Sequence, residues 1–238
     1  MRALIQLEQE GGLNFMTSRK IKIFEQIVQI TIDSITLEGA LTIPDQARGI
    51  ILFAHGSGSS RFSPRNILVA KELQEAGLAT LLIDLLTEDE DEIYENRFDI
   101  DLITQRLIDV TSWIQKQPDT KRLKIGYFGA STGAAAALKA SAKLGPKICA
   151  VVSRGGRPDL ANEVLSQVKA PTLLIVGGDD LEVIELNKEA YEKLKCVKEF
   201  EIIPGATHLF EEPGKLEWVA KYAADWFDKY LVEESNWR

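Results

Sequence analysis

The feature that most constrains the fold is an alternation of short apolar runs with longer segments of helical periodicity, beginning at residue 49. The apolar runs read GIILFAHG, ATLLIDLL, KIGYFGA, ICAVVSRGG, PTLLIVGGDD and VKEFEIIPGAT, and a helical pattern follows each of them. Apolar runs that alternate with helices are typical of a parallel sheet covered by helices on both faces. The sequence therefore predicts an α/β fold with six consecutive strand–helix units.

Two further strands are expected before these units, in IVQITID and ITLEGALTIP. Both segments alternate apolar and polar residues and are rich in β-branched side chains, with a tight turn between them at Asp33 and Ser34. This pattern predicts an antiparallel hairpin at one edge of the sheet. Residues 1–20 have a mixed composition that predicts a flexible N-terminal arm, which leaves 21–238 as a single domain. The segment TEDEDEIYEN (87–96) is expected to be an acidic surface loop.

Composition and charge exclude several classes of protein. The 238 residues are 45% hydrophobic and carry a net charge of −8, which fits one globular domain and disfavours nucleic acid and anionic lipid as partners. No apolar run approaches the roughly 20 residues of a membrane span, and the first residues contain acids where a signal peptide needs apolar side chains. We therefore expect a cytoplasmic chain, monomeric or homodimeric, whose partner is a small molecule.

Cysteine and histidine are too sparse to predict a metal site or a disulfide scaffold. The two cysteines, Cys149 and Cys196, lie in an apolar strand and at the end of a helix, and the two histidines have no metal-ligand spacing. No metal and no cofactor are expected.

The third apolar run of the alternating region ends in Gly129-Ala130-Ser131-Thr132-Gly133, which fits the pattern G-x-S-x-G. Glycines on both sides of the serine allow a sharp strand-to-helix turn that lifts the hydroxyl clear of the sheet, so Ser131 is the candidate nucleophile. A structural or phosphate-cradling turn is the alternative. A dinucleotide-binding turn is disfavoured, because the glycines at 126, 129 and 133 miss the spacing G-x-G-x-x-G.

A serine hydroxyl needs a base within hydrogen-bonding reach, and that base needs a third group to orient it. His208 follows the last predicted strand in PGATH, and Asp180 ends the preceding strand in GGDDLEV. Because the carboxyl ends of parallel strands share one edge of a sheet, Ser131, Asp180 and His208 are expected to lie together there. The adjacent Asp179 is the alternative acid.

The motif HGSGSS follows the first of the six strands and supplies candidate donors for an oxyanion. We expect the backbone amides of Ser57 and Thr132 to form the oxyanion hole, because such donors stabilise the charge of a tetrahedral intermediate. His55 opens this motif and is expected to hold the shape of the loop, since one catalytic base suffices.

These motifs occur in the order FAHGSGSSRFSPRN, GASTGA, VGGDDLEVIELN and PGATHLFEEPG, and they resemble those of the α/β-hydrolases. Within that superfamily the chain is similar to the dienelactone hydrolase-like group. The resemblance implies an α/β-hydrolase fold with the triad Ser131, Asp180 and His208. Dienelactone hydrolases proper are expected to use a cysteine nucleophile, so the serine at this position points to a general carboxylic ester or thioester as substrate.

One short connection between strands and two arginines indicate the size and charge of the substrate. Only SRGGRPDLANEVLSQVKAP lies between the fourth and fifth of the six strands, so no large cap domain is expected and an open site suits small acyl groups. Arg61 follows the oxyanion loop and Arg154 ends the fourth strand, and both are expected to contact a substrate carboxylate. The predicted function is a serine hydrolase acting through an acyl-enzyme. The alternative is a catalytically silent scaffold that binds or regulates.

Overall fold

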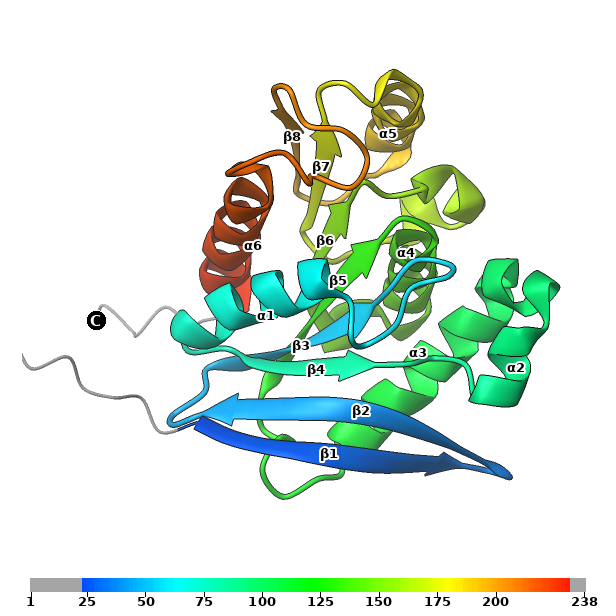
Figure 1. Cartoon of the computed structure of the whole chain (residues 1–238), viewed down its shortest axis with the longest axis vertical. Helices are drawn as coiled ribbons and strands as arrows, with labels where there is room; N and C mark the ends of the chain where they lie inside the picture. The colour runs from blue at the N-terminus through cyan, green and yellow to red at the C-terminus, as the bar shows by residue number, and fades with distance from the viewer. Residues whose placement is uncertain (1–22, 232–238) are drawn as a thin grey trace, which may run out of the picture.

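Eight strands of the described chain form one sheet, in the order β1-β2-β4-β3-β5-β6-β7-β8 (Figure 1). The structure is a computed structural model and describes residues 23–231. The arm predicted at residues 1–20 lies outside the described residues. The strands are β1 (Ile23–Ile32), β2 (Ile35–Pro44), β3 (Gly49–Ala54), β4 (Ala79–Ile83), β5 (Lys124–Ala130), β6 (Ile148–Arg154), β7 (Thr172–Gly177) and β8 (Lys198–Ile203).

The predicted edge hairpin is confirmed. Strand β1 pairs antiparallel with β2, with Ile32 opposite Ile35, and Asp33 adopts a φ of 50° in the two-residue turn between them. Such turns require positive φ, which Asp tolerates better than most residues. Strand β2 is also antiparallel to β4, whereas β4, β3, β5, β6, β7 and β8 are mutually parallel. The carboxyl ends of these six strands therefore share one edge of the sheet.

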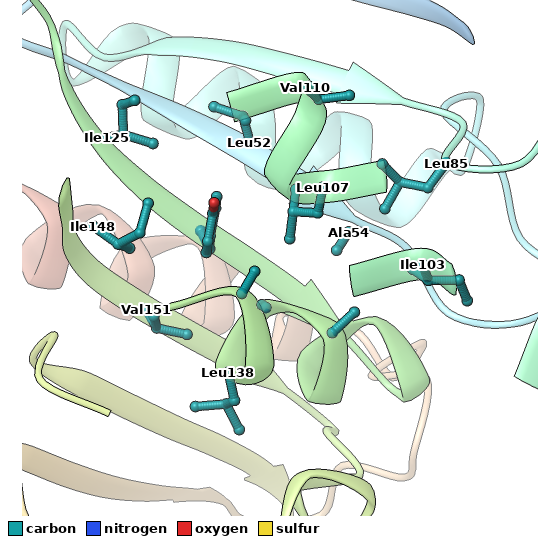
Figure 2. Packing of buried hydrophobic residues seen from close by; sticks show 14 of the residues in the cluster. Leu52, Ala54, Leu85, Ile103, Leu107, Val110, Ile125, Leu138, Ile148 and Val151 are labelled. Atoms are coloured by element: carbon teal, nitrogen blue, oxygen red, sulfur yellow. The ribbon is translucent and has the colours of Figure 1, made fainter. Parts of the chain in front are cut away.

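Helices cover both faces of the sheet, as predicted. The helices α1 (Pro64–Glu75) and α6 (Lys215–Leu231) pack on one face, where Val69 and Phe227 are buried in the same apolar cluster. The helices α3 (Ile100–Ile114), α4 (Thr132–Leu144) and α5 (Leu181–Lys193) cover the other face. Figure 2 shows Leu107 of α3 and Leu138 of α4 among the buried side chains of that second layer.

The acidic segment 87–96, predicted to be a loop, instead contains the short helix α2 (Glu88–Glu92) followed by a 3₁₀ turn (Tyr94–Phe98). Thr87 Oγ1 accepts the N–H of Glu90, and the Glu90 carboxylate accepts the N–H of Thr87. This capping box satisfies two of the free N–H groups at the start of the helix. Acidic residues in the first turn also favour the helix through its dipole, which composition alone did not reveal.

The helical pattern expected after the fourth apolar run, in DLANEVLSQV, does not form an α-helix. The structure has two 3₁₀ turns there, Pro158–Ala161 and Leu165–Gln167, which place Ala161 and Leu165 in the core. A further 3₁₀ turn, Gly145–Lys147, precedes β6. Residues 155–171 form the whole connection between β6 and β7, so the described chain carries no large cap domain there.

Within residues 23–231, no helix is both long enough and apolar enough to cross a membrane.

Candidate active site

Ser131 lies between the last residue of β5 and the first residue of α4, with φ 50° and ψ −122°. Positive φ is strained for a residue other than glycine, and such strain is common where a fold presents a reactive side chain. Serine at the start of a helix usually caps it, but the Ser131 side chain makes no cap hydrogen bond. The Ser131 N–H donates to the carbonyl of Arg154 at 3.2 Å, which ties the turn to the end of β6.

Glycine is required beside this turn because other backbone passes very close to it. A Cβ built on Gly133 would lie 2.1 Å from the carbonyl oxygen of Ala54 and 2.5 Å from that of His55. A Cβ built on Gly56 would lie 2.9 Å from Ser131 Cβ. The loop after β3 and the turn after β5 are therefore in direct backbone contact.

His208, in the loop after β8, lies with Nδ1 2.6 Å from Oδ2 of Asp180. Asp180 stands at the start of α5, where its side chain makes no cap hydrogen bond and turns to the imidazole instead. Asp179 is exposed, and its N–H donates to the carbonyl of Ala206 at 3.0 Å. The structure thus brings Asp180, and not its neighbour, against His208.

The imidazole also lies close to the end of β6. A Cβ built on Gly155 would lie 3.6 Å from His208 Cε1, and the residue before this glycine is the Arg154 whose carbonyl accepts the Ser131 N–H. Among the described residues no hydrogen bond joins Ser131 Oγ to the His208 ring. Such bonds are often long in a hydrolase without substrate and tighten when it binds.

The two predicted oxyanion residues lie together. The Ser57 N–H donates to Thr132 Oγ1 at 2.9 Å, and the Thr132 side chain is buried. This contact holds the oxyanion loop against the start of α4. It also engages the Ser57 N–H, so a bound oxyanion would have to replace the Thr132 hydroxyl as the acceptor.

Sequence reasoning missed a polar cluster under the oxyanion loop. His55 Nε2 lies 3.5 Å from Asp84 Oδ1, and the Arg61 N–H donates to the same oxygen at 2.6 Å. Burial raises the pKa of Asp84, but the nearby His55 imidazole and the hydrogen bonds from Arg61 outweigh it and hold this pKa below the usual range. The signal was an acid directly after an apolar strand.

Arg61 has its charge neutralised within this cluster. The guanidinium forms ion pairs with Asp84 and, at 2.5 Å, with Glu38 of the edge hairpin. The predicted contact of Arg61 with a substrate carboxylate therefore competes with two carboxylates of the protein. Arg154 is buried, and no carboxylate of residues 23–231 pairs with it.

A cavity of about 10 Å³ lies beside the oxyanion loop, between Ser57 and the segment that follows β4. Its lining includes Asp91 and Arg97, which form a two-pronged ion pair with Arg97 Nη2 2.9 Å from Asp91 Oδ2 and Nε 3.1 Å from Oδ1. A volume of this size holds about one water molecule. Across residues 23–231, no cluster of three His, Cys, Asp or Glu side chains is placed to hold a metal ion.

Comparison with known proteins places these features in a family. A dienelactone hydrolase from Anabaena variabilis is 57% identical, with a TM-score of 0.85 over 87% of this chain and 98% of that one. Est1E from Butyrivibrio proteoclasticus shares the fold at 17% identity, with a TM-score of 0.74 over 85% of this chain and 98% of its own.

A Mycobacterium tuberculosis protein named "Putative phosphoribosyl transferase" is 56% identical over 207 residues, which are 87% of this chain and 47% of that protein. The chain thus spans about half the length of the curated relatives it matches. The model of the Dienelactone hydrolase family matches residues 37–231. This chain therefore belongs to the dienelactone hydrolase family.

Proposed function

We propose that this member of a hydrolase family is a serine hydrolase that cleaves a small carboxylic ester or thioester through an acyl-enzyme. One observation carries the proposal: an uncapped serine with positive φ and a histidine–carboxylate pair at 2.6 Å share the carboxyl edge of the sheet. Serine, acid and histidine also follow one another along the chain in the order that this fold uses for hydrolysis.

In the proposed reaction, His208 Nε2 takes the proton of Ser131 Oγ as the oxygen attacks the carbonyl carbon. Asp180 keeps the imidazole oriented through Nδ1 and stabilises its positive charge. The oxyanion accepts hydrogen bonds from the backbone amides of Ser57 and Thr132. The protonated imidazole then gives its proton to the leaving alcohol or thiol. Water, deprotonated by His208, releases the acid and restores Ser131.

The order of the strands orients the substrate. The oxyanion loop follows β3 on one side of β5, whereas Asp180 and His208 follow β7 and β8 on the other. Because His208 must protonate the leaving group, that group lies toward β7 and β8, and the acyl group lies toward β3 and β4. The cavity of about 10 Å³ is on this acyl side, which supports a short acyl group.

The alternative function is a catalytically silent scaffold that binds or regulates. It would keep the pairing of His208 with Asp180 but would not turn over an ester. We assign no phosphoribosyl transfer to this chain, because the relative that carries that name is about twice as long. A cytoplasmic location and a monomeric or homodimeric state stay predictions.

A fluorophosphonate probe and p-nitrophenyl acetate distinguish the two functions. The probe should label Ser131 of the full chain, and Ser131→Ala should lose both labelling and turnover. Ser166→Ala removes an exposed serine between β6 and β7 and should keep both. Hydrolysis at full rate by Ser131→Ala would exclude the proposal.

A further inference from the structure

Five arginines surround the carboxyl edge of the sheet, and Arg154 differs from the other four in having no carboxylate within 4 Å among residues 23–231. The contrast is informative because an arginine is almost never buried without a partner for its charge. The paired arginines are Arg61 with Asp84 and Glu38, Arg65 with Glu211 at 2.9 Å, Arg97 with Asp91 at 2.9 Å, and Arg157 with Asp159 at 2.8 Å.

The Arg154 guanidinium is nonetheless buried, with the residue only 5% exposed. It makes one long hydrogen bond, from Nη2 to Oδ1 of Asn66 at 3.4 Å, and its Nε has no partner. The guanidinium carbon lies 5.8 Å from the centre of the Phe210 ring, two residues after His208. The side chain therefore lies between the start of α1 and the loop that carries the imidazole.

Burying an ionised group without a counter-charge is energetically unfavourable. Burial, with a smaller contribution from the positive charge of Arg65, lowers the pKa of Arg154 to about 10. The guanidinium is still charged at neutral pH, so the fold holds a cation in a buried position where its charge is poorly solvated. Buried charges of this kind are concentrated at binding and catalytic sites.

The surroundings of Arg154 add positive potential. Arg65 stands in the first turn of the 12-residue helix α1, which has no acidic residue there, and the N-terminus of a helix attracts anions. Glu211 offsets Arg65, but its side chain is 61% exposed and the pair is screened by solvent. The positive charges of Arg65 and Arg154 outnumber the single negative charge of Glu211 by one.

We propose that Arg154, with Arg65 at the start of α1, binds an anionic group, a carboxylate or a phosphate, carried by the leaving-group half of the ester. This inference rests on the proposed hydrolysis at Ser131. We assign the anion to the leaving group because of where Arg154 lies. It ends β6, on the same side of β5 as β7, β8 and His208. The substrate class is therefore an ester of a small acid with an anionic alcohol or phenol.

Matched acetate esters test the anion and its location. In 4-acetoxybenzoate and 4-acetoxyphenyl phosphate the charge is on the leaving group, and 4-acetoxybenzamide is the neutral counterpart of the first. In monophenyl succinate the charge is on the acyl group, and methyl phenyl succinate is its neutral counterpart. Wild type should prefer 4-acetoxybenzoate, the phosphate, or both, over the neutral amide by about 10- to 100-fold in kcat/KM, mainly through KM. The larger of the two ratios identifies the anion.

Arg154→Met should bring this ratio close to one, and Arg154→Lys should restore part of it because the charge is kept without the two-pronged geometry. Arg48→Met is the matched control, since Arg48 forms an ion pair with Asp228, 43% and 51% exposed, and should keep the wild-type ratio. A preference confined to monophenyl succinate, or an unchanged ratio in Arg154→Met, would overturn the inference.

The outcomes separate this inference from the proposed function. If wild type does not prefer the anionic esters but its hydrolysis still depends on Ser131, the anion site is rejected and the proposed hydrolase function stands. Hydrolysis that survives Ser131→Ala rejects the proposed function. Should Arg154→Met fail to fold, inhibition of wild type decides: 4-hydroxybenzoate should inhibit at least tenfold more strongly than 4-hydroxybenzamide, and equal inhibition would reject the anion site.

Discussion

His208 Nδ1 lies 2.6 Å from Asp180 Oδ2, a contact between residues 28 positions apart that joins the loop after β8 to the residue that precedes α5. The neighbouring Asp179 is exposed, and its backbone N–H donates to the carbonyl of Ala206. Variants of these two adjacent aspartates therefore test the role of the contact with His208, because both remove the same charge at nearly the same place in the chain.

Asp180→Asn should lower kcat/KM for p-nitrophenyl acetate by roughly 10³- to 10⁴-fold, because the imidazole loses its orientation and the partner of its positive charge. Asp179→Asn should stay within a few-fold of wild type. Thermal melting followed by circular dichroism checks that both variants fold. Equal losses in the two variants would show that the contact with His208 has no catalytic role.

Backbone strain at Ser131 should lower the free energy of unfolding, and a substitution that relieves the strain should raise it. Ser131→Gly relieves a positive φ that Ser131→Ala retains, and both variants lack the nucleophile. Relief of about 1–3 kcal/mol, reduced by about 0.4–1 kcal/mol for the extra freedom of glycine in the unfolded chain, should leave the glycine variant about 1 kcal/mol more stable. Urea unfolding of the two inactive variants gives this difference directly. A glycine variant less stable than the alanine variant would mean that the turn is not strained.

Gly133→Ala should damage activity and stability together. The added methyl would lie 2.1 Å from the Ala54 carbonyl, so the end of β3 and the oxyanion loop must move away from α4, at about 1–3 kcal/mol or more. Gly145→Ala, at the other end of α4, meets open space and strains only a φ of 58°. It should lower stability without changing kcat/KM. Normal kinetics in Gly133→Ala would disprove the close packing of these two loops.

The ion pair of Arg97 with Asp91 should limit acyl length. Arg97→Ala removes part of the lining of the small cavity beside Ser57 and should raise kcat/KM for p-nitrophenyl butyrate relative to the acetate by about tenfold, since the two additional CH₂ groups contribute about 0.8 kcal/mol each when buried. Arg122→Ala, an exposed arginine just before β5, should keep the wild-type preference. An unchanged preference in Arg97→Ala would place the acyl group elsewhere.

Acid should weaken the fold through Asp84. Its pKa is lowered in the folded state, so its contribution to the free energy of unfolding is complete above the unfolded value of about 3.9 and is lost as the pH falls through the folded value. The stability advantage of wild type over Asp84→Asn should therefore be larger at pH 6 than at pH 3. Urea unfolding of both proteins at the two pH values measures it. A difference that does not depend on pH would show that the carboxylate is not stabilised in its ionised form.

Local sequence patterns specified most of the fold. Apolar runs and helical periodicity depend on neighbours within a few residues, so the eight strands, the edge hairpin and the covering of both faces were predictable. The turn at Ser131 was predictable for the same reason, since flanking glycines mark it in the sequence. The helix α2 was missed because its capping box lies within an acidic, turn-like composition.

Side-chain partners were decided only by the tertiary structure. The sequence favoured Asp180 but left Asp179 open as the alternative acid, and only the folded chain shows that Asp180 contacts His208. Arg61 and Arg154 were both expected to contact a substrate carboxylate, but their pairing depends on residues far along the chain: Glu38 of the hairpin reaches Arg61, whereas no acid among the described residues reaches Arg154. Periodicity is a property of short segments, but electrostatic pairing acts through space, and only the folded chain brings those charges together.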